Sequence, residues 1–196
     1  MQDKKTLLIP DATYHIFNRA NGNEHLFYRD ENYLFFLGKY EKYISPVAET
    51  FCYCLMPNHF HFIIRIKNEV ELEKHLKSKS TLTGFQTLSG LNENALSKLL
   101  SRKGNLFMRP FKRKRITDEK YLKKVVHYTH YNPVEAGLIS KPEEWKYSSY
   151  NQIINPDRVH NPVRVESDEV IEWFGDKENF IYCHKYPPQE TGIEEW

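Results

Sequence analysis

The stretch ETFCYCLMPNHFHFIIRI, residues 49–66, holds the clearest structural signal in the chain. Its first part, Glu49–Leu55, and its last part, His59–Ile66, are rich in the aromatic, β-branched and small apolar residues that occur in strands. The segment Met56-Pro57-Asn58 between them is short and favours a turn. We therefore expect two antiparallel strands joined as a hairpin.

The two histidines of this stretch should share one face of the sheet. Residues i and i+2 of a strand project from the same face. His59 and His61 then lie on one side, and Phe60 and Phe62 on the other. Two imidazoles held in this way are either a half-buried polar pair or part of a metal site, which would need at least one further ligand.

The segments around the hairpin predict an alternation of strands and helices. Ala12–Asn18 alternates as a strand, and Asp30 is the expected N-cap of a helix that runs through Ile44 and ends at Pro46. The expected apolar stripe of this helix comprises Leu34, Phe35, Leu37, Tyr40 and Ile44. Downstream, the patterns predict a helix over 70–79, a loop over 81–90, a helix from 92 or 94 to 104, a basic loop and strand over 106–116, and a helix from the Asp118 cap to Pro133. The order β-α-β-β-α-(α)-β-α predicts an α+β fold, the ferredoxin-like split βαβ antiparallel sheet with helices on one face.

Composition limits the class of protein. The chain has 196 residues, 40% of them hydrophobic, which suits one domain over residues 1–150 with an acidic, aromatic C-terminal extension over 151–196. We expect the extension to be irregular, with a helical turn near Ser167–Phe174. The sequence contains no run of 18 apolar residues and no signal-peptide pattern, which predicts a cytoplasmic protein without a membrane partner.

Charge is distributed unevenly along the chain. Ten Lys or Arg residues and two acids lie from Arg102 to Lys124, whereas nine acids and three Lys or Arg residues lie from Arg164 to Trp196. The basic run RPFKRKR is interleaved with aromatic residues, as expected of a protein that neutralises a DNA backbone and stacks on unpaired bases. The DNA-binding candidates are Arg109, Lys112, Arg113, Lys114 and Arg115, with Lys124 on the following helix and Arg19 and Asn21 after the first strand.

The helix after Asp118 carries a tyrosine beside its core stripe. The stripe comprises Leu122, Val125, Val126 and Thr129. Tyr128 lies roughly 120° from that stripe, on the same side as Tyr121, Lys124 and Asn132, so we expect it to point away from the core. A phenol with a pKa of about 10 is a poor nucleophile, but it can attack a phosphodiester if a metal ion polarises the phosphate.

Three segments resemble one family. MPNHFHFII resembles the HUH motif (histidine, bulky hydrophobe, histidine) of single-tyrosine HUH nucleases. HYTHYNPVEAGLI followed by EEWKYSSY resembles the helix and tail of insertion-sequence-200-like transposases, closest to the REP-associated tyrosine transposases. The opening YHIFNRANGNEHLFYRDENYLFFL is similar to the first strand, loop and helix of that branch. Together these segments cover about residues 12–150.

The resemblance implies metal-dependent cleavage of single-stranded or hairpin DNA through a covalent 5′-phosphotyrosine. His59 and His61 match the metal ligands, Asn132 a third ligand, and Tyr128 the nucleophile, with Mg²⁺ or Mn²⁺ as the expected ion. Tyr131 is the competing nucleophile. Asn58 stands where relatives often carry a carboxylate. The protein would be a monomer or a homodimer, and nucleoid-associated when bound to DNA.

Two other functions remain open at this point. A catalytically silent nucleic-acid-binding module on the same fold would bind DNA without forming an adduct. A metal hydrolase of small phosphoesters would use both histidines with a water nucleophile and would need neither the tyrosine nor the basic run.

Overall fold

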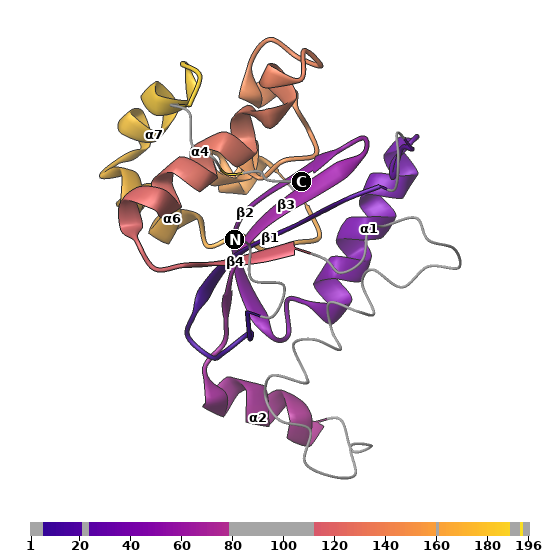
Figure 1. Ribbon diagram of the computed structural model, residues 1–196, viewed down its shortest axis with the longest axis vertical. Helices are drawn as coiled ribbons and strands as arrows, with labels where there is room; N and C mark the ends of the chain where they lie inside the picture. The colour runs from indigo at the N-terminus through magenta and orange to yellow at the C-terminus, as the bar shows by residue number, and fades with distance from the viewer. Residues whose placement is uncertain (1–5, 21–23, 79–111, 160, 189–192, 194–196) are drawn as a thin grey trace.

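The computed structural model describes residues 6–20, 24–78, 112–159, 161–188 and 193 (Figure 1). Its centre is a four-stranded sheet in the order β2-β3-β1-β4, in which every neighbouring pair is antiparallel. The strands are β1 (Thr13–Arg19), β2 (Ala48–Met56), β3 (His59–Ile66) and β4 (Lys112–Ile116). The predicted α+β sheet and the hairpin of β2 and β3 are therefore observed.

Helices follow the strands in the expected order, with more of them toward the C-terminus. They are α1 (Asp30–Tyr43), α2 (Glu69–Ser78), α4 (Glu119–Glu135), α5 (Tyr150–Ile154), α6 (Ser167–Phe174) and α7 (Lys177–His184), with short 3₁₀ turns at Pro142–Glu144 and Pro156–Arg158. The predicted loop at 81–90 and helix ending at 104 lie outside the described residues. In the part of the chain that is described, none of the helices has the length and apolarity to cross a bilayer.

Helices cover both faces of the sheet, so the expectation of one covered face is wrong (Figure 1). On one face α1 packs on the phenylalanines of β3, and the ring centroids of Tyr40 and Phe62 lie 4.2 Å apart. On the other face α4 crosses β2, where the Cys52 thiol lies 3.9 Å from the carbonyl oxygen of Val126. Seven of the eight β3 residues from His59 to Ile66 are apolar or histidine, so both sides of this strand need cover.

The N-cap of α1 and the first residues of its buried stripe differ from the expectation. Arg29, not Asp30, is the N-cap, and the Asp30 carboxylate instead accepts hydrogen bonds from Lys146 and Tyr147. Leu37, Tyr40 and Ile44 of the expected stripe are buried, but Leu34 and Phe35 are 51% and 54% exposed. The buried residues of α1 are Tyr33, Phe36, Leu37 and Tyr40. Tyr33 is drawn inward by stacking on Tyr147, with ring centroids 3.6 Å apart.

The helix α4 begins as predicted but does not stop at its proline. The Asp118 side chain accepts a hydrogen bond from the backbone N–H of Tyr121 at 2.6 Å, which is the expected N-cap. The helix then continues through Pro133 to Glu135. Proline has no backbone N–H, so the helix loses one hydrogen bond at Pro133. This loss is tolerated because only two residues of the helix follow.

The motif EEWKYSSY covers the open edge of β2. The backbone N–H of Leu55 donates to the Tyr147 carbonyl at 2.9 Å, and that of Ser149 donates to Tyr53 at 3.0 Å. Cys54 and Ser148 form an antiparallel bridge between these bonds. The segment therefore pairs with the Tyr53–Leu55 part of the β2 edge and covers backbone groups that other chains could join.

The C-terminal extension is helical and shares the core, which differs from the irregular segment expected beyond residue 151. The predicted helical turn at Ser167–Phe174 is α6, whereas the helix α7 was not predicted. Arg65 of β3 binds Glu169 of α6 through two nitrogen–oxygen contacts of 2.8 and 3.0 Å. Val170 and Phe180 are completely buried. The helices α6 and α7 lie on the same side of the sheet as α4 (Figure 1).

Candidate active site

The two histidines of β3 lie on the sheet face that α4 covers. In the register of the sheet, Arg19 of β1 is opposite His59, and Phe17 is opposite His61. The rings of His59 and His61 meet edge to face, with centroids 5.1 Å apart. His61 is completely buried and His59 is half-buried. The alternation of strand residues therefore places both imidazoles together, as the sequence predicted.

The tyrosine and the amide of α4 meet these histidines. The Tyr128 ring stands perpendicular to the His61 ring, at a centroid distance of 5.7 Å. The Asn132 Oδ1 atom lies 3.1 Å from His59 Nε2. Tyr128 is thus half-buried between helix and sheet, which corrects the expectation that it points away from the core. The cause is that α4 lies on the sheet face itself, so the side of the helix that carries Tyr128 also faces protein.

The competing tyrosine lies elsewhere. Tyr131 is half-buried, and its ring contacts the edge of His127 at a centroid distance of 6.0 Å. Three residues along a helix correspond to a rotation of about 300°, which moves Tyr131 about 60° from the direction of Tyr128. The ring contact that reaches a histidine of β3 is made by Tyr128.

Each candidate ligand histidine is held by a partner on its far nitrogen. His59 Nδ1 lies 2.6 Å from the side-chain oxygen of Asn58, and His61 Nδ1 lies 2.9 Å from His15 Nε2. Such contacts fix the orientation and tautomer of a ligating imidazole. Sequence reasoning treated Asn58 only as a departure from the family and missed His15. The signal for His15 was its place on the alternating strand ATYHIFN, but its partner depends on the register between β1 and β3.

The donor set fits a divalent ion. His59 Nδ1–H can donate to Asn58 Oδ1, and His59 Nε2 lies within hydrogen-bond distance of Asn132 Oδ1; with an ion bound, Nε2 would turn its lone pair to the ion beside that oxygen. Two ligands at right angles, each about 2.1 Å from an octahedral ion, are about 3.0 Å apart, close to the distance between these two atoms. His61 would bind through Nε2, since its Nδ1 faces His15. Within the described ranges there is no cluster of three His, Cys, Asp or Glu side chains suited to a metal, so Asn132 as third ligand stays a prediction of the sequence.

The basic strand β4 divides its charges between the two faces. Lys112 and Lys114 pair with Phe17 and His15 in the register, so they share the face of the histidines. The Lys114 ammonium lies 4.3 Å from the centre of the Tyr121 ring. Arg113 and Arg115 alternate with them and point to the face of α1.

The other DNA-binding candidates are placed unevenly. Arg19 lies beside His59 on the neighbouring strand, and Lys124 is one helical turn before Tyr128. Arg109 and Asn21 lie outside the described residues. The structure thus gathers Arg19, Lys112, Lys114 and Lys124 on the side of the histidines.

A chain of buried histidines holds the back of α4. His130 Nδ1 lies 3.1 Å from His184 Nε2, and His184 Nδ1 lies 2.7 Å from the carbonyl oxygen of Phe180. A carbonyl only accepts, so His184 Nδ1–H donates to Phe180, and His130 Nδ1–H donates to His184. The Ser149 hydroxyl, 2.8 Å away, then donates to His130 Nε2. This chain joins α4, α7 and the strand-like segment near Ser149 while both rings stay neutral.

Burial disfavours the charged form of these rings. It lowers the pKa of His184 from 6.5 to about 3, with a further lowering from His127. It also holds the pKa of His130 well below its ordinary value. An unfolded histidine binds a proton below about pH 6.5, whereas His184 in the folded protein does not. The unfolded chain therefore binds more protons in this range, and stability increases with pH.

We expect the free energy of unfolding to fall by about 1–2 kcal/mol between pH 7 and pH 5 through His184 alone. Urea denaturation of the wild type and of His184→Gln at both pH values measures this. The variant should be less stable at pH 7 and should lose less stability on acidification. An equal loss in both proteins would show that His184 does not titrate with a lowered pKa.

Fold and site together define the class: a mixed α and β protein with an antiparallel sheet that presents two histidines to a tyrosine and an amide on a crossing helix. No family model matches the chain. Over 113 residues, 56% of this chain, the sequence is 26% identical to a curated protein of Haemophilus influenzae named "Putative REP-associated tyrosine transposase". The match spans 62% of the length of that relative.

A solved structure similar to this one belongs to the same class of protein as that relative. It is a REP-associated tyrosine transposase bound to a REP hairpin, and it is similar with a TM-score of 0.55 at 16% identity. The similarity covers 85% of this chain and 96% of that one. The resemblance predicted from the motifs is therefore confirmed, and the structural likeness confirms the fold. The roles of the individual site residues stay predictions.

Proposed function

We propose that this protein is a metal-dependent single-stranded DNA endonuclease and strand transferase, a transposase-type enzyme that acts on hairpin or palindromic repeat DNA. The observation that carries the proposal is the meeting of Tyr128 with His61, and of Asn132 with His59, across the sheet and α4. A relative named as a REP-associated tyrosine transposase and a fold neighbour bound to a REP hairpin support the same class of substrate.

In this proposal each residue has a defined task. His59 and His61, with Asn132 as third ligand, hold Mg²⁺ or Mn²⁺, which when bound withdraws charge from the scissile phosphate. The Tyr128 oxygen attacks the phosphorus and its proton is lost to solvent. The bond from phosphorus to the 3′ oxygen breaks, and that oxygen takes a proton. The products are a 5′-phosphotyrosine and a free 3′-hydroxyl, and attack by a 3′-hydroxyl on the phosphotyrosine reverses the step and joins strands.

The experiment that tests the proposal is a search for the covalent adduct. The protein is incubated with Mn²⁺ and with hairpin oligonucleotides taken from inverted repeats of its own genome, and the mixture is separated under denaturing conditions. We expect a labelled band that contains both DNA and protein. This band should be absent when EDTA removes the metal ion. Binding without such a band, for every hairpin, would favour the silent binding module.

The hydrolase alternative makes a different prediction. A metal hydrolase of small phosphoesters would cleave a chromogenic phosphodiester with water, and Tyr128→Phe would leave that activity intact. The placement of Lys112 and Lys114 on the site face favours DNA over a small ester, because a small ester needs no extended row of cations.

The two faces of β4 give a matched test of DNA contact. We expect the double change Lys112→Ala and Lys114→Ala to weaken hairpin binding roughly tenfold or more and to reduce the slope of log K against log salt by about 2. The control is Arg113→Ala with Arg115→Ala, which removes the same charge from the opposite face. Filter binding over a range of salt concentrations measures both. If the two pairs have equal effects, the strand does not present one face to DNA.

A further inference from the structure

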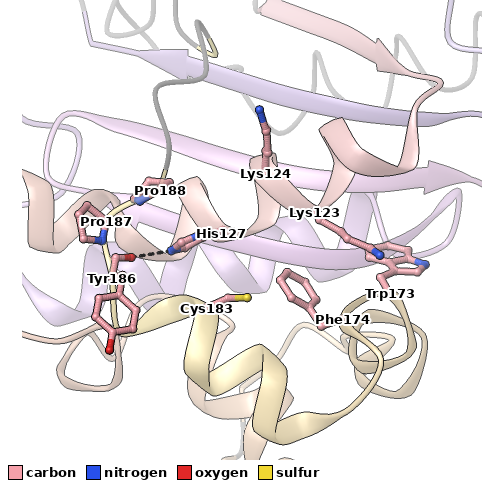
Figure 2. A pocket seen from close by; sticks show the side chains of 9 residues that line it. All are labelled: Lys123, Lys124, His127, Trp173, Phe174, Cys183, Tyr186, Pro187 and Pro188. Carbon is pink, nitrogen blue, oxygen red and sulfur yellow. Dashed lines mark hydrogen bonds between the residues drawn. The ribbon is translucent and has the colours of Figure 1, made fainter.

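A second hollow lies on α4, away from the histidines of β3. The pocket lies between α4 and the C-terminal helices and has a volume of about 390 Å³ (Figure 2). This is within the range of about 300–1,000 Å³ typical of small-ligand sites. Lys123, Lys124 and His127 of α4 line one side of it, and Trp173, Phe174 and Cys183 of α6 and α7 line the other, with two prolines after α7.

The walls of the pocket combine flat apolar surfaces with cations. Figure 2 shows the Trp173 and Phe174 rings on one side, with the Cys183 thiol directed into the space between them and α4. Lys123 forms an ion pair of 2.9 Å with Glu119, but the two side chains are 39% and 69% exposed, so water competes strongly with this pair. Among the described residues, Lys124 forms no ion pair with a carboxylate. A phosphate can therefore recruit Lys123, whose side chain runs toward Trp173, at little cost, whereas Lys124 points away from the aromatic walls (Figure 2).

The pocket is held open by contacts behind its walls. His127 Nε2–H donates to the carbonyl oxygen of Tyr186 at 2.9 Å, which fixes the segment after α7. The Phe174 ring packs edge-on against buried Phe180 at a centroid distance of 5.0 Å. The Trp173 ring rests on Phe51 of the core at 4.7 Å. These contacts fix the positions of the aromatic walls without a ligand.

The pocket adjoins the candidate nucleophile along one helix. Lys124 precedes Tyr128 by four residues, so the two share one side of α4 and are separated by about 6 Å along its axis. His127 is the residue immediately before Tyr128. A strand whose phosphate reaches Tyr128 can therefore extend to the pocket by crossing the outer side of α4, where Lys124 lies.

We propose that this pocket binds one unpaired nucleotide of the DNA strand, next to the cleavage point. Its base stacks among the aromatic and proline walls, its phosphate binds Lys123, and Lys124 contacts the strand on the outer side of α4. Stacking on aromatic side chains and neutralisation by lysine are the two contacts that single-stranded DNA offers regardless of sequence. The inference rests on the proposed function, because it takes the same DNA as ligand. It also gives the C-terminal extension a task, since α6, α7 and the residues that follow form most of the wall.

The first test removes bases from the DNA and leaves the protein unchanged. Wild-type protein, with EDTA present so that no cutting occurs, is titrated with hairpins that carry a single-stranded flank with one abasic position at a time. We expect one position near the cleavage point at which loss of the base weakens binding about 5- to 100-fold. A flat profile, or equal binding of flanked and unflanked hairpins, would overturn the proposal.

The second test fills the pocket. Cys183→Trp places a large ring in the space, and Cys183→Ser keeps the space open. We expect Cys183→Trp to weaken binding of the flanked hairpin by the same factor as the abasic site, and to leave binding of the unflanked hairpin unchanged. The control is Tyr182→Ala, which removes a neighbouring aromatic ring of α7 that is 59% exposed and outside the pocket.

The outcomes separate this inference from the proposed function. The adduct assay with Mn²⁺ is run on the same protein and the same hairpins. Adduct formation with a flat abasic profile overturns the pocket alone. Failure to bind any hairpin overturns both. Loss of binding to flanked and unflanked hairpins alike in Cys183→Trp, with Cys183→Ser normal, would mean that the larger ring disturbs the fold, and the abasic profile of the wild type then decides.

Discussion

Replacing Tyr128 with phenylalanine is expected to abolish the covalent protein–DNA adduct while hairpin binding stays within about twofold of the wild type. The change removes the attacking oxygen and keeps the ring, whose edge-to-face contact with His61 at 5.7 Å does not involve the hydroxyl. Loss of a nucleophile that acts with its partners as one unit costs several orders of magnitude, so we expect adduct formation to fall at least about 10³-fold. Denaturing gels with a labelled hairpin measure the adduct, and filter binding measures affinity.

The control for this change is Tyr131→Phe, three residues further along α4. Its ring meets His127 rather than a histidine of β3. We expect this variant to form the adduct at a rate close to that of the wild type. The reverse result, in which Tyr131→Phe is inactive and Tyr128→Phe is active, would assign the chemistry to the competing tyrosine.

The second large effect is expected at the paired histidines. His59→Ala or His61→Ala should each lower the rate of adduct formation by more than about 100-fold at fixed Mn²⁺, because loss of an outer partner of a metal ligand alone costs about 10- to 100-fold. Raising the Mn²⁺ concentration should restore part of the activity of the His59 variant, since His59 is half-buried and can be replaced by water. Isothermal titration of Mn²⁺ into the free protein gives a readout that does not depend on activity.

The matched control is His75→Ala, which removes a histidine from α2. This variant should bind Mn²⁺ and form the adduct as the wild type does. If His59→Ala and His61→Ala bind Mn²⁺ with unchanged affinity, the two imidazoles are not metal ligands. They are then the half-buried polar pair that the sequence also allowed.

Much of the site could be predicted because it depends on local periodicity. The i, i+2 rule placed His59 and His61 on one face, and the helical wheel placed Tyr128 and Asn132 on one side of α4. Neither rule says which face of the sheet a helix covers. That choice depends on the burial of both sides of β3, and it decided that Tyr128 meets the sheet rather than solvent.

The features that were missed depend on long-range contacts. His15 supports His61 only because β1 and β3 pair in one particular register. The predicted stripe of α1 was wrong at Leu34 and Phe35, and Tyr33 is buried instead because it stacks on Tyr147, far away in the sequence. The helix α7 has charged and apolar residues on all sides, so its pattern is weak, and His184 on His130 anchors it instead.

The most direct measurement of the central claim is to locate the DNA on the protein. The adduct formed with a hairpin in Mn²⁺ is digested with a nuclease and a protease, and the peptide that keeps a nucleotide is sequenced by mass spectrometry. We predict a 5′-phosphate joined to the side-chain oxygen of Tyr128, and no such peptide when EDTA is present. A nucleotide on Tyr131, or on any residue outside α4, would contradict the account.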